Sequence, residues 1–314
     1  MLLTLAHSPD PDDAFMWWPI TGKVRPDGTP LAGAQGMARI DTGGIEFRAV
    51  PADIEVLNRR AAAEGDLDIT ALSFRAWCDV KDRYAITHCG SSFGEGFGPK
   101  VVAGTAVRDA ADLKRAGLRI AIPGRRTTAF LLLSMLLGPE VTRAAAIVEM
   151  PFEQVIGAVA RGEVDAGVVI HEGQLLFADA GLHLVVDLGR WWGSTTGLPV
   201  PLGCNALRLD LDARFGEGTI ATVSRLLRAS IDFALANRAE SLEYTMPFAL
   251  ANAAKKGATE SGRPTLDRVD RYVAMYVNRW TVDMGDEGRE AVRRLLLAGH
   301  AAGLSPDPGE VRLV

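Results

Sequence analysis

Short apolar runs alternate with amphipathic stretches along the first two thirds of the chain. Runs such as LLTLAHS (2–8), GIEFRAV (44–50) and LDITALS (67–73) have the length and apolar content of β-strands. The stretch ADIEVLNRRAAAEG (52–65), between the last two, has helical spacing, an aspartate near its start as N-cap and a glycine as its stop. Strands separated by helices predict right-handed βαβ units and parallel sheets. We therefore predict an α/β protein.

Helical spacing dominates the last third of the chain. Amphipathic stretches cover residues 219–237, 239–254, 265–278 and 286–303. We predict two α/β lobes, one formed by residues 1–100 plus 204–314 and the other by residues 101–203. The chain would cross between them near Pro99–Val102 and again near Pro201–Asn205. Two crossings permit hinge closure of the lobes around a small ligand.

Two further segments carry weaker signals. Residues 23–44 are rich in Gly, Pro and Thr and contain the turn signal RPDGTP (25–30), so we predict an excursion from the main fold with a hairpin. The stretch DAADLKRAG (109–117) predicts a short capped helix.

The composition is that of an ordinary globular protein. The chain has 314 residues, of which 48% are hydrophobic and 23% charged, and its formal net charge of −5 offers no basic footprint for nucleic acid. Its first residues lack the basic and apolar regions of a secretory signal, and no apolar run reaches the roughly 18 residues of a membrane span. Its three cysteines have no metal-binding spacing. We expect a cytoplasmic protein with no nucleic-acid or membrane partner.

One of only five histidines, His171, directly follows an apolar run in GVVIHEG (167–173). Ligands of open α/β sheets bind beyond the carboxyl ends of the strands, and the pKa of imidazole suits a base that works near neutral pH. The alternative is a surface histidine at a strand end, and spacing alone leaves both open. Glu172 is adjacent, and adjacent residues of a strand point to opposite faces, so we do not expect it to pair with His171.

A second candidate is the stretch PGRRTTAF (123–130), where a strand passes into a helix. Thr127 and Thr128 at this helix start would offer hydroxyls and free backbone N–H groups to a carboxylate or phosphate. The alternative is an ordinary threonine N-cap. The stretch is not a nucleotide-binding P-loop, because it lacks the GxxxxGK[ST] pattern.

Two more strand ends carry polar residues. The acids of SPDPDDAF (8–15) could bind a divalent metal, but we favour an acidic helix start, in which Asp10 or Ser8 caps and Pro11 is an early helical residue. No second acidic cluster has suitable spacing, so we predict no metal site. Ser73 could contact a ligand, or it could be a small polar turn residue.

Six motifs together carry a family resemblance. They are SPDPDDAF, DITALSF, IPGRRTTAF, GEVDAGVVIHEG, DLGRWW with TGLPVPLG, and YVNRWTVDMGDEGREAV, and they occur in this order. On these motifs the chain resembles the 1,4-dihydroxy-6-naphthoate synthases of the futalosine route to menaquinone, over nearly its whole length except residues 23–44. The resemblance implies a periplasmic-binding-protein-like (type II) fold, with two α/β lobes joined by two crossing segments and a ligand cleft between them.

The resemblance also implies a reaction and its residues. Cyclic dehypoxanthine futalosine, the small-molecule substrate, would be split to 1,4-dihydroxy-6-naphthoate and a sugar-derived fragment by a carbon–carbon lyase that needs no redox cofactor. His171 matches the family's proton acceptor. The substrate-contacting positions match Ala71, Leu72, Ser73, Thr128 and Ala129, with Thr127 adjacent. A homodimer is the assembly to consider, although no sequence signal sets the oligomeric state.

The chain also departs from the family pattern. The first motif more often reads Ser-Pro-Cys-Pro-Asn-Asp-Thr-Phe, whereas this chain has Asp10, Asp12 and Ala14 in place of Cys, Asn and Thr. Ala71 stands where a lysine can occur. If that lysine holds the substrate carboxylate, this chain must use another group, for which Arg125 and Arg126 are candidates.

Two other functions fit the same pattern. One is the sister enzyme chorismate dehydratase, although the HEG and SPDPDD elements favour the naphthoate synthase. The other is a non-catalytic binding protein whose lobes close on a small carboxylate.

Overall fold

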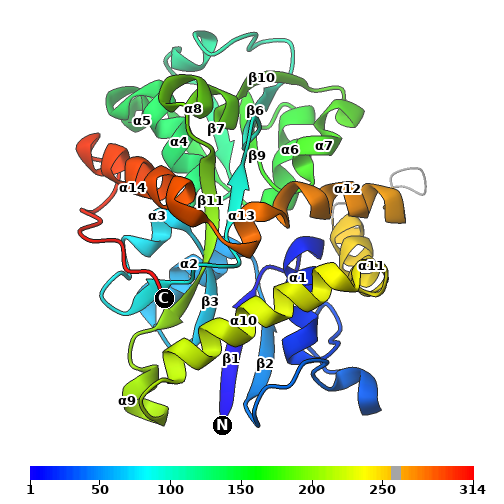
Figure 1. Cartoon of the computed structure of the whole chain (residues 1–314). Helices are drawn as coiled ribbons and strands as arrows, with labels where there is room; N and C mark the ends of the chain where they lie inside the picture. The colour runs from blue at the N-terminus through cyan, green and yellow to red at the C-terminus, as the bar shows by residue number, and fades with distance from the viewer. Residues whose placement is uncertain (256–262) are drawn as a thin grey trace.

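Two separate β-sheets organise the chain, one in each lobe (Figure 1). The computed structural model describes residues 1–255 and 263–314. The first sheet has the order β2-β1-β3-β11-β4, with β5 paired to β11, and the second has the order β10-β6-β9-β7-β8. The strands of the first sheet are β1 (Leu2–His7), β2 (Glu46–Pro51), β3 (Ile69–Ser73), β4 (Tyr84–Ile86), β5 (Ser92–Gly94) and β11 (Val200–Arg208). Those of the second are β6 (Lys100–Ala103), β7 (Arg119–Ile122), β8 (Ala146–Glu149), β9 (Ala166–Val169) and β10 (His183–Asp187).

Both sheets are mixed, so the prediction of parallel sheets was wrong in part. β1 pairs parallel with β2 and β3, and β7 pairs parallel with β8 and β9. β11 is antiparallel to β3, and β6 is antiparallel to β9. The reason is the path of the chain: β6 and β11 are the strands that follow the two crossings. They start at the boundary between the lobes, where β3 and β9 end.

Helices cover both sheets, and the predicted helical tail is confirmed. The first lobe contains α1 (Pro11–Thr21), α2 (Ile54–Ala63), α3 (Phe74–Trp77), α9 (Leu211–Phe215), α10 (Thr219–Ala236) and α11 (Arg238–Lys255). The second contains α4 (Thr128–Leu137), α5 (Pro139–Ala144), α6 (Phe152–Ala160), α7 (Gly173–Leu176) and α8 (Leu188–Thr196). Three helices lie across the middle of Figure 1, namely α12 (Leu266–Tyr276), α13 (Arg279–Val282) and α14 (Gly285–Ala301).

The predicted helix at residues 109–117 was wrong, because only Asp112–Lys114 forms a single 3-10 turn. The carboxylate of Asp109 accepts hydrogen bonds from the backbone N–H groups of Ala111 (2.8 Å) and Asp112 (3.1 Å). Such local side-chain bonds compete with the helical pattern and favour a turn.

The excursion at residues 23–44 does contain a hairpin-like turn. Val24 forms an isolated antiparallel bridge with Pro30, and a 3-10 turn follows at Gly33–Gly36. Val24 is buried against Trp18 of α1 and Tyr244 of α11, and its N–H donates to the Tyr244 hydroxyl at 3.1 Å. The segment therefore covers the outer side of α1.

The largest apolar cluster continues from one lobe into the other. It includes Phe74 and Phe93 of the first lobe and Val101, Ile122 and Leu132 of the second, all almost completely buried. Because burial of apolar area is the main stabilising term in folding, the two lobes are held together by a shared core as well as by two chain crossings.

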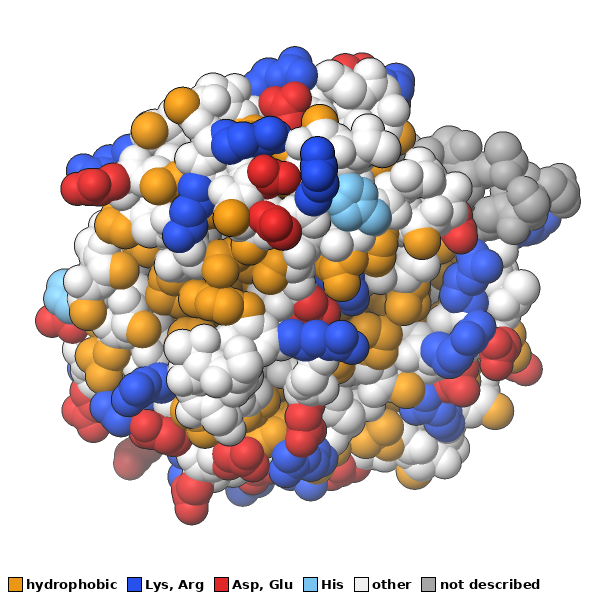
Figure 2. Space-filling model, turned by 90° about the horizontal axis from the view of Figure 1, so that it is seen from above, with side chains coloured by type: hydrophobic (Ala, Val, Ile, Leu, Met, Phe, Trp, Pro, Cys, Tyr) orange, Lys and Arg blue, Asp and Glu red, His pale blue; other side chains and the backbone are white. Residues whose placement is uncertain are grey.

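The face of the second lobe in Figure 2 has hydrophobic side chains in its middle, with charges of both signs interspersed.

Among the described residues, no helix combines the length and apolar character that crossing a membrane would require.

Two glycines pack backbone against backbone beside the first crossing. A Cβ on Gly189, in the first turn of α8, would lie 2.1 Å from the carbonyl oxygen of Phe97 and 2.5 Å from the nitrogen of Gly98. No side chain fits without moving this backbone.

We predict that Gly189→Ala lowers the free energy of unfolding by roughly 1–3 kcal/mol, as overpacking does. Gly193→Ala in the same helix is the matched control, because its nearest neighbour, the oxygen of Leu198, would be 3.8 Å from the new Cβ. That control should be neutral or stabilising by about 0.5–1 kcal/mol. Calorimetric melting temperatures compare the two, and equal melting temperatures would contradict the close packing.

Candidate active site

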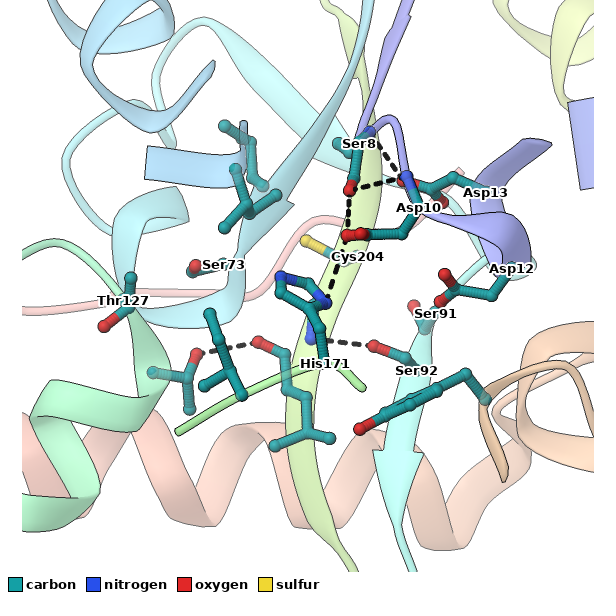
Figure 3. A pocket seen from close by; sticks show the side chains of 18 of the residues that line it. Ser8, Asp10, Asp12, Asp13, Ser73, Ser91, Ser92, Thr127, His171 and Cys204 are labelled. Carbon is teal, nitrogen blue, oxygen red and sulfur yellow. Dashed lines mark hydrogen bonds and ion pairs between the residues drawn. The ribbon is translucent and has the colours of Figure 1, made fainter. Parts of the chain in front are cut away.

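One cavity lies between the lobes, where β1, β3, β7 and β9 end (Figure 3). All seven residues that the sequence analysis singled out line it: Ala71, Leu72, Ser73, Thr127, Thr128, Ala129 and His171. Further lining residues come from the start of α1, from β11 and from α12, including Asp10, Asp12, Asp13, Cys204, Asn205 and Tyr276. The cavity is therefore built from segments that are far apart in the sequence.

The end of β3 is held in place by α2. The backbone N–H of Ser73 donates to Asn58 Oδ1 at 2.9 Å, and Asn58 Nδ2 donates to the Ser73 hydroxyl at 3.1 Å. Asn58 is 1% exposed and belongs to a helix whose N-cap, Asp53, accepts from the backbone N–H of Glu55 as predicted. Asn58 could not be predicted from the sequence, because one asparagine in an amphipathic helix gives no distinctive signal.

The start of α4 combines the two interpretations that the sequence left open. Thr127 is the N-cap, since its hydroxyl accepts from the N–H of Phe130 at 3.1 Å and donates to the Gly124 carbonyl at 2.8 Å. The hydroxyl of Thr128 donates to the Leu202 carbonyl at 2.8 Å. Within the described part of the chain, the N–H groups of Thr128 and Ala129 have no hydrogen-bond partner. The backbone of this helix start can therefore still accept an anion.

The expectation that Arg125 or Arg126 replaces a family lysine is not supported. Arg125 pairs with Glu149 at 3.6 Å, and Arg126 forms a close ion pair with Asp79 of the first lobe. Neither arginine lines the cavity. Both side chains are drawn away from the cavity by carboxylates on neighbouring segments.

His171 has an unusual backbone conformation. Among the described residues other than glycine, it alone has a positive φ, of 52°. This left-handed region costs a non-glycine residue of order 1 kcal/mol, and strain of this kind clusters at functional sites. The conformation bends the chain directly after β9 and turns the imidazole toward the other lobe (Figure 3).

The two ring nitrogens of His171 have different surroundings. Nδ1 lies 3.2 Å from Asp10 Oδ2, across the boundary between the lobes, and the ring packs edge-on against Phe152 with centroids 4.9 Å apart. Nε2 is buried and has no hydrogen-bond partner among the described residues. A buried nitrogen that lacks a partner is costly unless a ligand supplies one.

The acidic start of α1 forms side-chain hydrogen bonds that the predicted helix cap did not include. Asp10 stands at the N-cap position, and Pro11 is the first helical residue as expected, but the Asp10 side chain makes no capping bond. Its carboxylate instead accepts from the Ser8 hydroxyl and from Asn252 Nδ2. Asp13 accepts the N–H of Ser8 at 2.7 Å.

Burial and mutual repulsion perturb the titration of these groups. Burial lowers the pKa of His171, but the charges of Asp10 and then Asp12 raise it, and the net direction is upward. Burial, helped by the nearby carboxylates of Asp13 and Asp10, raises the pKa of Asp12 well above its usual range. Burial also raises the pKa of Asp13 to about 7. Both carboxyl groups therefore keep a proton to higher pH than an ordinary aspartate does.

A second polar contact joins the lobes at the cavity. Gln174 Nε2 donates to the Tyr276 hydroxyl at 2.6 Å, and Lys100 Nζ donates to Gln174 Oε1 at 3.2 Å. Neither Gln174 nor Tyr276 could be predicted from the sequence, since nothing in the chain marks α7 and α12 as neighbours. These contacts hold segments of both lobes together beside the cavity.

Taken together, these groups can perform proton transfer. The cavity offers a histidine nitrogen without a partner among the described residues, a carboxyl group whose pKa is raised and a helix start for an anion. This is the equipment for moving a proton on a bound carboxylate-containing molecule.

Comparisons with known proteins agree with this description. Residues 3–301 match the family model described as menaquinone biosynthesis. The chain is 36% identical to the 1,4-dihydroxy-6-naphthoate synthase of Thermus thermophilus, over 98% of this chain and 97% of that one. A solved structure from Archaeoglobus fulgidus is similar with 37% identity and a TM-score of 0.77, covering 96% of this chain and 98% of the other.

The fold extends beyond these relatives. A Candida albicans protein with the generic periplasmic-binding-protein fold aligns with a TM-score of 0.60 at 8% identity, over 100% of this chain and 98% of that one. The fold that the sequence resemblance implied is therefore confirmed.

The cavity's cysteine should be chemically inert. Burial raises the pKa of Cys78 to about 11 and that of Cys89 to about 12, and it raises the pKa of Cys204, which lines the cavity, further still. Because the thiolate is the reactive form, we predict that iodoacetamide at neutral pH labels the folded protein at least about tenfold more slowly than the urea-unfolded protein. Intact-mass spectrometry measures both rates. Labelling of the folded protein as fast as that of the unfolded protein would contradict this environment.

Proposed function

This chain belongs to the menaquinone biosynthesis family and is a biosynthetic enzyme, and we propose that it splits cyclic dehypoxanthine futalosine to 1,4-dihydroxy-6-naphthoate and a small sugar-derived fragment. Two observations support the proposal. The name of the relative states the product, and the cavity contains a histidine and a helix start suited to proton transfer on a bound anion. We place the reaction in the cytoplasm, which suits a biosynthetic enzyme with three free cysteines.

The observation that carries the proposal is the environment of His171. Its Nδ1 faces a buried carboxylate, and its Nε2 has no partner among the described residues. A catalytic base needs one ring nitrogen fixed and the other available, and the positive φ indicates that the surrounding structure holds the residue at a conformational cost. A surface histidine at a strand end would need none of these features.

The N–H groups of Thr128 and Ala129 are the proposed anchor for the substrate carboxylate. They are unpaired donors at the start of a ten-residue helix, and both residues line the cavity. Ala71 and Ser73 line the same cavity from the end of β3. Because burial raises the pKa of Asp12, its carboxyl repels a bound anion less than an ordinary aspartate would.

The proposed step is a base-initiated cleavage. His171 Nε2 takes a proton from the substrate, and the electron pair of that bond moves into the substrate skeleton. The carbon–carbon bond to the leaving fragment breaks, and the fragment takes up the departing electron pair together with a proton. The remaining ring becomes aromatic, which favours product formation. The lobes exclude water around the base during this step.

We predict that purified protein forms 1,4-dihydroxy-6-naphthoate from cyclic dehypoxanthine futalosine, and that His171→Gln reduces kcat by roughly 10²–10⁴-fold with substrate affinity nearly unchanged. Mass spectrometry follows the product, and calorimetric titration measures binding to the variant.

The outcomes separate the alternatives. No product from wild-type protein that nevertheless binds the substrate would point to a non-catalytic binding protein. Turnover by His171→Gln at the wild-type rate would exclude His171 as the base.

The pH dependence supplies an independent prediction. A protonated imidazole cannot accept a proton, so activity is lost as the pH falls through the pKa of His171. Because that pKa is raised in the folded protein, we expect the acid limb of kcat above the ordinary histidine value of about 6.5. Rates measured from about pH 5 to pH 9 locate the limb. A limb well below 6.5 would contradict the environment described here.

A further inference from the structure

The histidine and its carboxylate partner belong to different lobes. Asp10 follows β1 of the first sheet, and His171 follows β9 of the second. Their contact of 3.2 Å is one of several polar contacts across the lobe boundary, with Gln174 to Tyr276 at 2.6 Å and the ion pair between Arg126 and Asp79. Opening the lobes would separate all of these contacts.

The Asp10 carboxylate is rigidly held before it meets the histidine. The residue is 0% exposed. The Ser8 hydroxyl donates to Oδ2, and Asn252 Nδ2 donates to Oδ1 at 2.8 Å. Both donors lie in the first lobe, so the carboxylate keeps its orientation whether or not the second lobe is close.

The pairing decides which ring nitrogen is basic. Opposite an ionised Asp10, Nδ1 of His171 carries the proton that faces the carboxylate, because an ionised carboxylate can only accept hydrogen bonds. In the neutral ring the lone pair then lies on Nε2. This is the nitrogen that is buried without a partner, and Figure 3 shows it on the side of the ring away from Asp10.

We propose that Asp10 is the positioning residue for His171: it fixes the proton of the neutral ring on Nδ1 and so leaves Nε2 as the base, and because the two residues belong to different lobes, only the closed enzyme has this pairing. This inference rests on the proposed function for the role of His171. It assigns a purpose to one departure of this chain from the family motif, the aspartate in place of cysteine at position 10.

Other charged groups also face the imidazole. Asp12 from the same helix start, Asp53 from the start of α2 and the adjacent Glu172 all raise the pKa of His171, and each does so less than Asp10. Removing Asp10 should therefore shift the titration of His171 without abolishing the effect of the remaining carboxylates.

The central test is Asp10→Asn. The amide keeps the shape of the carboxylate but can offer an N–H to Nδ1, which places the ring proton on Nε2 and removes the base. We expect kcat to fall by roughly 10²–10⁴-fold with KM changed by less than about threefold. We also expect the acid limb of the residual kcat to move down by about one pH unit, since the stabilising charge is lost.

Asp79→Asn is the matched control. It removes another ion pair between the same two lobes, with Arg126, but Asp79 does not line the cavity. Its acid limb should coincide with that of the wild-type enzyme. Nitrogen-15 NMR of histidine-labelled protein reports the tautomer and titration of His171 without any turnover, with His171→Gln used to assign the signal.

The outcomes distinguish this inference from the proposed function. If wild-type protein makes no product, the proposed function fails. If it makes product but Asp10→Asn keeps the wild-type kcat, acid limb and tautomer, the positioning role fails alone. If Asp10→Asn does not fold, Asp10→Ser, which is smaller and also uncharged, takes its place with the same expectations. A shift of the limb that appears equally in Asp79→Asn would also overturn the role of Asp10.

Discussion

The cavity depends on one constraint of chain direction. Every strand that reaches the boundary between the lobes either ends there, as β1, β3, β7 and β9 do, or starts there after a crossing, as β6 and β11 do. The residues that follow a strand end do not have to form the hydrogen bonds of a sheet. They can therefore adopt turns, helix starts and strained conformations. Two sheets that direct their strand ends toward each other concentrate such residues in one place.

Much of the site could be predicted from the sequence because its residues follow strand ends that are themselves recognisable. His171, Ser73 and Thr127 each come after an apolar run, and the general rule for α/β sheets places them together. The helical tail was equally clear from its periodicity. The mixed direction of the sheets was not, because apolar runs carry no sign of direction.

The residues that escaped prediction act through tertiary contacts. Asn58 holds Ser73 from a helix, and Tyr276 meets Gln174 across the lobe boundary. Neither pairing has a local signature in the chain. Asp10 was predicted only in part. Its position before Pro11 suggested a helix cap, and the helix does begin there. Its carboxylate, however, is held by Asn252 and lies against His171 of the other lobe, which no local pattern indicates.

The contact between Asp10 and His171 makes the motion of the lobes a proton-linked process. A carboxylate nearby favours the imidazolium form, so under our proposal the closed arrangement binds a proton more tightly than the open one. Linkage is reciprocal: acid conditions then favour closure of the empty cleft, and alkaline conditions favour opening. An enzyme built this way would hold itself shut, in the form that cannot act as a base, when its surroundings become acidic.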